Sequence, residues 1–120
     1  MTTQELYAKL GANYEEAKGR MMNDVLINRF LLKFAQTYSL DALLAAQQKR
    51  DGHALFEAAH SLKGVCGNLA LTKLYVLASD LTEKTRNFAE GAAFDASSEV
   101  ALIKNEYEAT VSAIRECLGQ

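Results

Sequence analysis

Apolar residues recur at intervals of three and four along most of this chain, and no proline interrupts the pattern. Such spacing places apolar side chains on one face of an α-helix, whose period is about 3.6 residues. The longest example ends the chain and comprises Val100, Ile103, Tyr107, Val111, Ile114 and Leu118. Helices with one apolar stripe and short connections pack as antiparallel neighbours. The sequence therefore predicts an all-α fold, an antiparallel four-helix bundle with a short additional N-terminal helix.

Capping and turn residues predict where the first two helices begin and end. Residues 2–5 have the Thr-x-x-Glu spacing of a capping box, which predicts a brief first helix that ends before Gly11. Asn23 is a candidate N-cap for a second helix that continues to about Lys49. Within it, Ser39 is a point where the helix restarts or kinks.

Three further helices are expected in the remainder of the chain. A turn at residues 51–52 precedes a helix that runs to about Asn68. The next helix starts at about Thr72, and its apolar stripe extends as far as Phe88. Residues 90–91 then separate it from the long last helix.

Length, charge and cysteine content limit the functional class. The chain has 120 residues, enough for one domain spanning residues 1–120 but too few for a kinase with its own nucleotide site. Its net charge of −2 argues against nucleic acid as a partner. No run approaches the roughly 18 apolar residues of a membrane span, and no signal peptide is recognisable. Cys66 and Cys117 fit a reducing compartment, so we expect a cytoplasmic chain without disulfides. We also expect a monomer without membrane contacts.

The segment Ala59–Leu69 is the most informative part of the chain for function. It is predicted to be helical, yet it contains Gly64 and Gly67, each of which costs about 1 kcal/mol relative to alanine in a helix interior. At about 100° per residue, the predicted core stripe of this helix consists of Leu55, Ala59, Leu62, Cys66 and Leu69. His60 lies roughly 140° from that stripe, beside both glycines. We therefore expect an exposed histidine next to a strip of helix without side chains, which a partner can approach.

These residue types suit a nucleophile that accepts an anionic group. Lys63 stands one turn after His60 and leaves a cation near the imidazole. Phe56, one turn before His60, is either a partly exposed contact for a partner or part of the edge of the core. His53 lies on nearly the same face, but two turns separate it from His60, roughly 10 Å, so we expect no metal site.

The run His60-x-Leu62-Lys63-Gly64, followed by small residues and Leu69, resembles the signature of histidine-containing phosphotransfer (HPt) domains. Residues 31–34 and Asp51 also resemble the helix and the acidic turn that precede the histidine in this family. The resemblance implies a phosphocarrier of a multistep phosphorelay, in which His60 attacks the aspartyl phosphate of a receiver domain. The implied partners are response-regulator receiver domains and a hybrid sensor histidine kinase. The receiver would supply Mg²⁺, so no cofactor is expected on this chain.

Two positions on the following helix depart from the family pattern or extend it. Some members carry a glutamine that contacts the imidazole, and the matching position here is Thr82. Arg86 is similar to a basic residue of some members. For both residues ordinary solvated helix surface is the competing interpretation. The resemblance thus leaves open which group orients the ring of His60.

Two other classes of function compete with the phosphocarrier. A helical adaptor with an incidental histidine would have the same fold, because four-helix bundles serve many functions. A stand-alone enzyme is disfavoured, because the sequence has no recognisable nucleophilic triad, Gly-rich phosphate loop or pair of carboxylates around His60.

Overall fold

The computed structural model describes residues 1–119 as a set of helices joined by short loops. In chain order the helices are α1 (Thr3–Leu10), α2 (Tyr14–Met21), α3 (Asp24–Thr37), α4 (Asp41–Lys49), α5 (Gly52–Leu69), α6 (Thr72–Thr85) and α7 (Ser97–Leu118). The one β feature among residues 1–119 is an isolated bridge between Asp51 and Ala93. The predicted all-α class is therefore confirmed.

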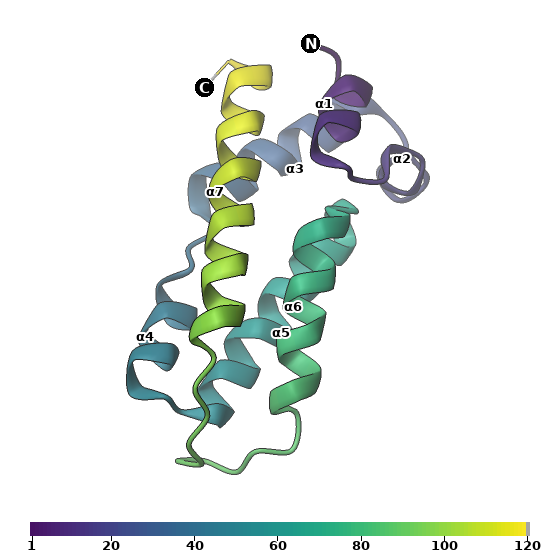
Figure 1. Ribbon diagram of the computed structural model, residues 1–120. Coiled ribbons are helices and arrows are strands. Elements are labelled where there is room, and N and C mark those ends of the chain that lie inside the picture. The colour runs from purple at the N-terminus through teal and green to yellow at the C-terminus, as the bar shows by residue number, and fades with distance from the viewer. Residues whose placement is uncertain (120) are drawn as a thin grey trace.

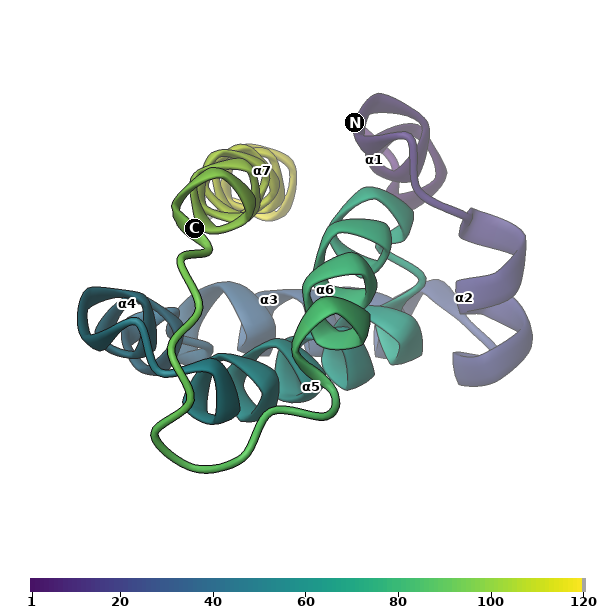
Figure 2. The same ribbon diagram turned by 60° about the horizontal axis from the view of Figure 1, so that its bottom comes forward.

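Three long helices, α5, α6 and α7, run side by side, and α3 and α4 together complete the bundle (Figure 1). Helices α5, α6 and α7 alternate in direction, and α5 packs along α6. Helix α4 packs beside α5, whereas α3 passes behind α7 in this view. Helices α1 and α2 cover the end of the bundle where α5 finishes. Viewed from below, α5 lies on the side of the bundle away from α7 (Figure 2).

The prediction for the first helix is confirmed in detail. The Thr2 hydroxyl accepts a hydrogen bond from the backbone of Glu5, and the Glu5 carboxylate accepts one from the backbone of Thr2. Gly11 ends α1 with a φ of 63°, a left-handed conformation that glycine adopts without a steric penalty.

The second predicted helix is divided in two. The backbone becomes extended at Tyr38, and the hydroxyl of Ser39 accepts a hydrogen bond from the backbone of Asp41. The restart at Ser39 is therefore correct, and a kink within one continuous helix is not what forms. The break is held in place by Tyr107, whose hydroxyl donates to the carbonyl of Tyr38 at 2.6 Å.

Helix α2 was not predicted, because it has almost no apolar stripe. Ala17 is its one buried residue. Polar local interactions hold it instead: Asn13 caps its first turn, and Arg20 pairs with Glu16 one turn earlier at 2.7 Å. Amphipathic periodicity cannot detect a helix of this kind.

The expected extension of α6 to Phe88 is wrong. Helix α6 ends at Thr85, and Phe88 folds back onto the start of α5, where a Cβ on Gly52 would lie 2.0 Å from its ring. Gly52 is thus required for close approach, and it is the first residue of α5 and not part of a free turn. Figure 2 shows the α6–α7 connection passing beneath this end of α5, where the Gly52 amide donates to the carbonyl of Ala92.

Helix α1 is anchored to the far end of α5 by a buried hydrogen bond. Tyr7 is fully buried, and its hydroxyl donates to the carbonyl of Leu69 at 2.8 Å. Burial raises the pKa of this phenol, so it stays a hydrogen-bond donor at neutral pH. The contact joins the N-terminal helix to the last residue of the helix that carries His60.

We predict that Tyr7→Phe lowers the free energy of unfolding by about 1–2 kcal/mol, because it leaves the buried carbonyl of Leu69 without its donor. The control is Tyr14→Phe, which removes a hydroxyl bonded to Asp24 in a part-buried position that water can reach. This control should cost within about 0.5 kcal/mol. Urea unfolding of the two variants measures the difference, and equal losses would contradict the prediction.

Candidate functional site

Helix α5 has one buried face and one exposed face, and the sequence predicted both. Asp51 starts the helix by accepting hydrogen bonds from the backbone amides of His53 and Ala54. The five residues of the predicted core stripe are all buried, namely Leu55, Ala59, Leu62, Cys66 and Leu69. His60 and Gly64 are exposed on the opposite face. The predicted outward placement of His60 is therefore confirmed.

The ring of Phe56 supports the imidazole of His60. The two rings are nearly parallel, at 9°, with centroids 5.5 Å apart. Phe56 is itself half-buried, and the guanidinium of Arg86 lies 5.6 Å from its ring centroid. Half-burial is compatible with both expectations for Phe56, a partly exposed contact and the edge of the core, and its ring in addition stacks against the imidazole.

A carboxylate that sequence analysis did not identify stands at the centre of the cations near His60. The Nε of Arg86 donates to Glu83 Oε1 at 3.1 Å, and the Nζ of Lys63 lies 4.0 Å from Glu83 Oε2. Hydrogen bonding from Arg86 lowers the pKa of Glu83, and the nearby charges of Arg86, Lys63 and His60 lower it further. Glu83 is therefore ionised at neutral pH and lies within electrostatic reach of the imidazole.

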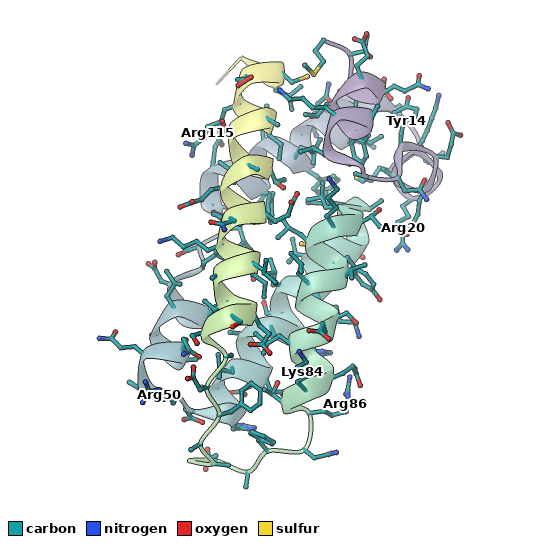
Figure 3. All side chains as sticks on the ribbon, in the orientation of Figure 1. Tyr14, Arg20, Arg50, Lys84, Arg86 and Arg115 are labelled. Carbon is teal, nitrogen blue, oxygen red and sulfur yellow. The ribbon has the colours of Figure 1, made fainter. Side chains whose placement is uncertain are left out.

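Arg86 reaches this site from the end of α6. Figure 3 shows Lys84 and Arg86 at the lower end of that helix, with Lys84 towards α7 and Arg86 directed away from it. Lys84 accordingly pairs with Glu99 of α7 at 3.1 Å, whereas the Arg86 guanidinium lies over the ring of Phe56 in α5. Arg86 is exposed, as the solvated-surface interpretation expects, and it also contacts both Glu83 and Phe56.

Thr82 does not take part in the site. It is fully buried, and its hydroxyl donates to the carbonyl of Ala78 at 2.7 Å, one turn earlier in α6. Both interpretations offered from the sequence, a ring-orienting group and solvated surface, are therefore wrong. The next residue, Glu83, is the one that α6 presents towards His60.

The two glycines of the motif differ in their surroundings. A Cβ added at Gly64 would meet no atom within 4 Å in the part of the chain that the structure describes, apart from its own helix. A Cβ at Gly67 would lie 3.3 Å from the ring of Tyr75 in α6. Lys63 extends over the same ring, 6.0 Å from its centroid. Gly64 leaves an open surface, whereas Gly67 gives room to Tyr75, so the expectation of a bare strip at both positions holds for Gly64 alone.

A groove runs between α3 and α5 towards α2. Its volume is about 510 Å³. Phe30 and Phe34 of α3 face Val65 and Leu69 of α5 across it, and Phe30 is exposed to 44 %. The cations Arg20 and Lys33 also line the groove. Its floor is thus apolar and its rim includes positive charge.

Other reactive groups are placed less favourably. Burial raises the pKa of the Cys66 thiol to about 12, so this cysteine is no nucleophile at neutral pH. The Nε2 of His53 lies 3.7 Å from the Glu57 carboxylate, one helical turn later, so this imidazole already has an acidic neighbour. Residues 1–119 contain no group of three or more His, Cys, Asp and Glu side chains arranged to hold a metal ion. No helix among the same residues has the length and apolar character to span a bilayer.

Comparison with known protein families gives a match. The family model described as Hpt domain matches residues 30–114, which include α4, α5, α6 and most of α3 and α7. Helices α1 and α2 precede the matched region. The comparisons with curated proteins and with solved structures found no match.

We predict that Gly64→Ala raises the free energy of unfolding by up to about 1 kcal/mol, because alanine favours the helix and its methyl group meets open space. Gly67→Ala is the matched comparison. Its gain should be smaller or absent, because the ring of Tyr75 must shift to admit the methyl group. Thermal unfolding followed by circular dichroism tests this order, and a larger gain at position 67 would contradict it.

Proposed function

The chain belongs to the Hpt domain family, and we propose that it carries a phosphoryl group on His60 between receiver domains of a multistep phosphorelay. Hpt domains act in two-component signalling as histidine phosphocarriers and interact with receiver domains and kinases. The observation that carries the proposal for this chain is the exposed His60, with Lys63 one turn on and an open backbone surface at Gly64.

In the proposed reaction a nitrogen of the His60 imidazole attacks the phosphorus of an aspartyl phosphate on the receiver. A nitrogen–phosphorus bond forms as the bond between phosphorus and the aspartate oxygen breaks, and the bonding electrons leave with the aspartate carboxylate. Transfer to a second receiver is the same exchange in reverse. Mg²⁺ and the acidic pocket belong to the receiver in this scheme, so this chain contributes no cofactor.

The side chains around His60 suit this role. The parallel ring of Phe56 limits rotation of the imidazole, which keeps the attacking nitrogen aimed outwards. Lys63 supplies a half-buried cation that can contact the phosphoryl oxygens by a charge-assisted hydrogen bond. Arg86 adds a second positive charge at the N-terminal side of His60, by Phe56.

The surface around Gly64 is where we place the receiver. The absent side chain at position 64 lets the partner backbone approach the helix next to His60. The groove between α3 and α5 is lined by Val65, the residue after Gly64. Its apolar floor, with Arg20 and Lys33 at the rim, suits an apolar surface of the receiver flanked by acidic residues. A hybrid sensor kinase is the proposed source of the phosphoryl group, delivered through its own receiver.

The remaining parts of the proposal concern setting and assembly. We place the exchange in the cytoplasm, where thiols such as those of Cys66 and Cys117 stay reduced. We propose that the chain works as a monomer, because one copy contains every side chain that the proposed transfer requires of the carrier.

We predict that His60→Gln abolishes phosphoryl acceptance from a phosphorylated receiver and leaves the fold intact, because the side chain is exposed. His53→Gln is the matched control on the same helix and should label normally. The measurement is transfer of radioactive phosphate to the chain, with the acid-labile and alkali-stable behaviour of phosphohistidine. Labelling that persists in His60→Gln would refute the assignment and favour the helical adaptor, and labelling lost only in His53→Gln would move the site.

We predict that Gly64→Gln slows transfer from a receiver at least tenfold while a small phosphodonor such as acetyl phosphate still labels His60. The physical reason is that a side chain at position 64 projects into open space, where it obstructs a protein but not a small molecule. Parallel labelling with the two donors separates the effects. Equal rates for variant and wild type with the receiver would show that the partner does not approach over Gly64.

A further inference from the structure

We infer that Glu83 sets how readily the proposed phosphohistidine gives up its phosphoryl group, by holding the cations that would otherwise stabilise it. This inference rests on the proposed function of His60. It assigns to Glu83 an effect on the transfer equilibrium, beyond any effect on the rate.

The first step is the arrangement of charges before transfer. Both carboxylate oxygens of Glu83 accept hydrogen bonds from Arg86, and the Lys63 ammonium lies 4.0 Å from one of them, Oε2. The Lys63 side chain is exposed to only 23 %, so it is held against α6 and does not extend freely into solvent. Both cations near His60 are therefore already engaged by the same anion.

The second step is the change that a phosphoryl group brings. Phosphorylation adds about two negative charges at the imidazole. Lys63 can contact them only if it weakens its interaction with Glu83, and the carboxylate itself repels the new charge. Without Glu83, Lys63 and Arg86 would present a local charge of +2, and with Glu83 the local charge is +1. Glu83 thus disfavours the phosphorylated state relative to the unmodified state.

The third step separates this role from that of a positioning residue. A group that only orients the imidazole changes the forward and reverse rates by the same factor and leaves the equilibrium unchanged. A group that interacts differently with the unmodified and phosphorylated histidine must change the equilibrium. The equilibrium constant for transfer is therefore the quantity that identifies the role of Glu83.

A phosphocarrier needs such a balance. Its phosphohistidine must be favourable enough to form and unfavourable enough to pass the group to the next receiver. Glu83 supplies an internal competitor for the cations, which keeps the phosphorylated state from becoming too stable. The competing anion is exposed, so its effect is moderate and decreases as salt screens it.

The test is Glu83→Gln in the full chain, which removes the charge and retains an amide oxygen for Arg86. Purified phosphorylated receiver is mixed with the variant, and the amounts of phosphorylated receiver and phosphorylated carrier are measured at equilibrium. We expect the equilibrium constant towards the carrier to rise about two- to fivefold at low salt and to fall back towards the wild-type value near 1 M salt. The half-life of the isolated phosphohistidine should not fall.

Two further variants make the test specific. Asp80→Asn removes one negative charge from the same helix, but Asp80 pairs with Lys84 at 3.1 Å on the α7 side, so the equilibrium should stay within experimental error of wild type. Arg86→Gln removes a cation and leaves Glu83 to Lys63, so the equilibrium should move in the opposite direction to that of Glu83→Gln.

The outcomes distinguish the inference from the proposed function. If wild type accepts no label on His60, the proposed function fails. If wild type accepts label and Glu83→Gln changes both rates equally with an unchanged equilibrium, Glu83 only positions the ring and the inference is overturned. An equal shift for Asp80→Asn would also overturn it, because net charge and not the contact with Lys63 would then be the cause.

Discussion

The packing of the apolar stripe of α5 determines where the candidate site can be. Leu55 and Ala59 are fully buried, and Leu62 is exposed to 1 %, so the helix cannot rotate about its axis without exposing them. This fixes His60 on the outward face. The hydrogen bonds that join the two ends of the helix to other segments, from the Gly52 amide to Ala92 and from Tyr7 to Leu69, fix its position along the axis. His60 therefore stands on a rigid element, which the proposed carrier function requires.

The parts of the fold that sequence analysis predicted are those that bury a regular stripe. Helices α5 and α7 each present apolar residues at helical intervals, and both form near the expected bounds. Helix α2 escaped notice because its one buried residue, Ala17, makes no pattern. Phe88 led to the opposite error, a helix predicted to be too long. It continues the apolar spacing of α6, but the helix ends at Thr85 and Phe88 packs against Gly52 and Phe94 from the loop that follows. Periodicity reports burial, and burial is not confined to helices.

Within the candidate site, the placement of residues on one helix could be predicted from the sequence, whereas the contacts between two helices could not. The relative placement of His60, Lys63 and Gly64 follows from helical geometry alone, because they share α5. Which residues of α6 face them depends on how α6 is rotated and shifted against α5, and no single-helix pattern contains that information. The sequence analysis considered Thr82, which is buried in the structure. The next residue, the exposed Glu83, is the one whose carboxylate lies near His60. The one local signal was the spacing of three between Glu83 and Arg86, which favours an ion pair on a helix surface.

One residue within α5 and the residue that caps its C-terminal end do not suit the backbone conformation at their positions. Ala70 ends the helix with a φ of 54°, a left-handed conformation that costs an L-residue about 1 kcal/mol and that glycine would adopt freely. Its methyl group is buried, and the carbonyl of Ala70 accepts a hydrogen bond from Asn13, so contacts within the chain offset that cost. Gly64 is the reverse case, because alanine would suit the helix better and a methyl group there would touch nothing. No packing within residues 1–119 requires the glycine, whereas Gly52 and Gly67 each make room for an aromatic ring. In the proposed function, this open position is where the receiver approaches α5 from outside, at the turn of helix next to His60.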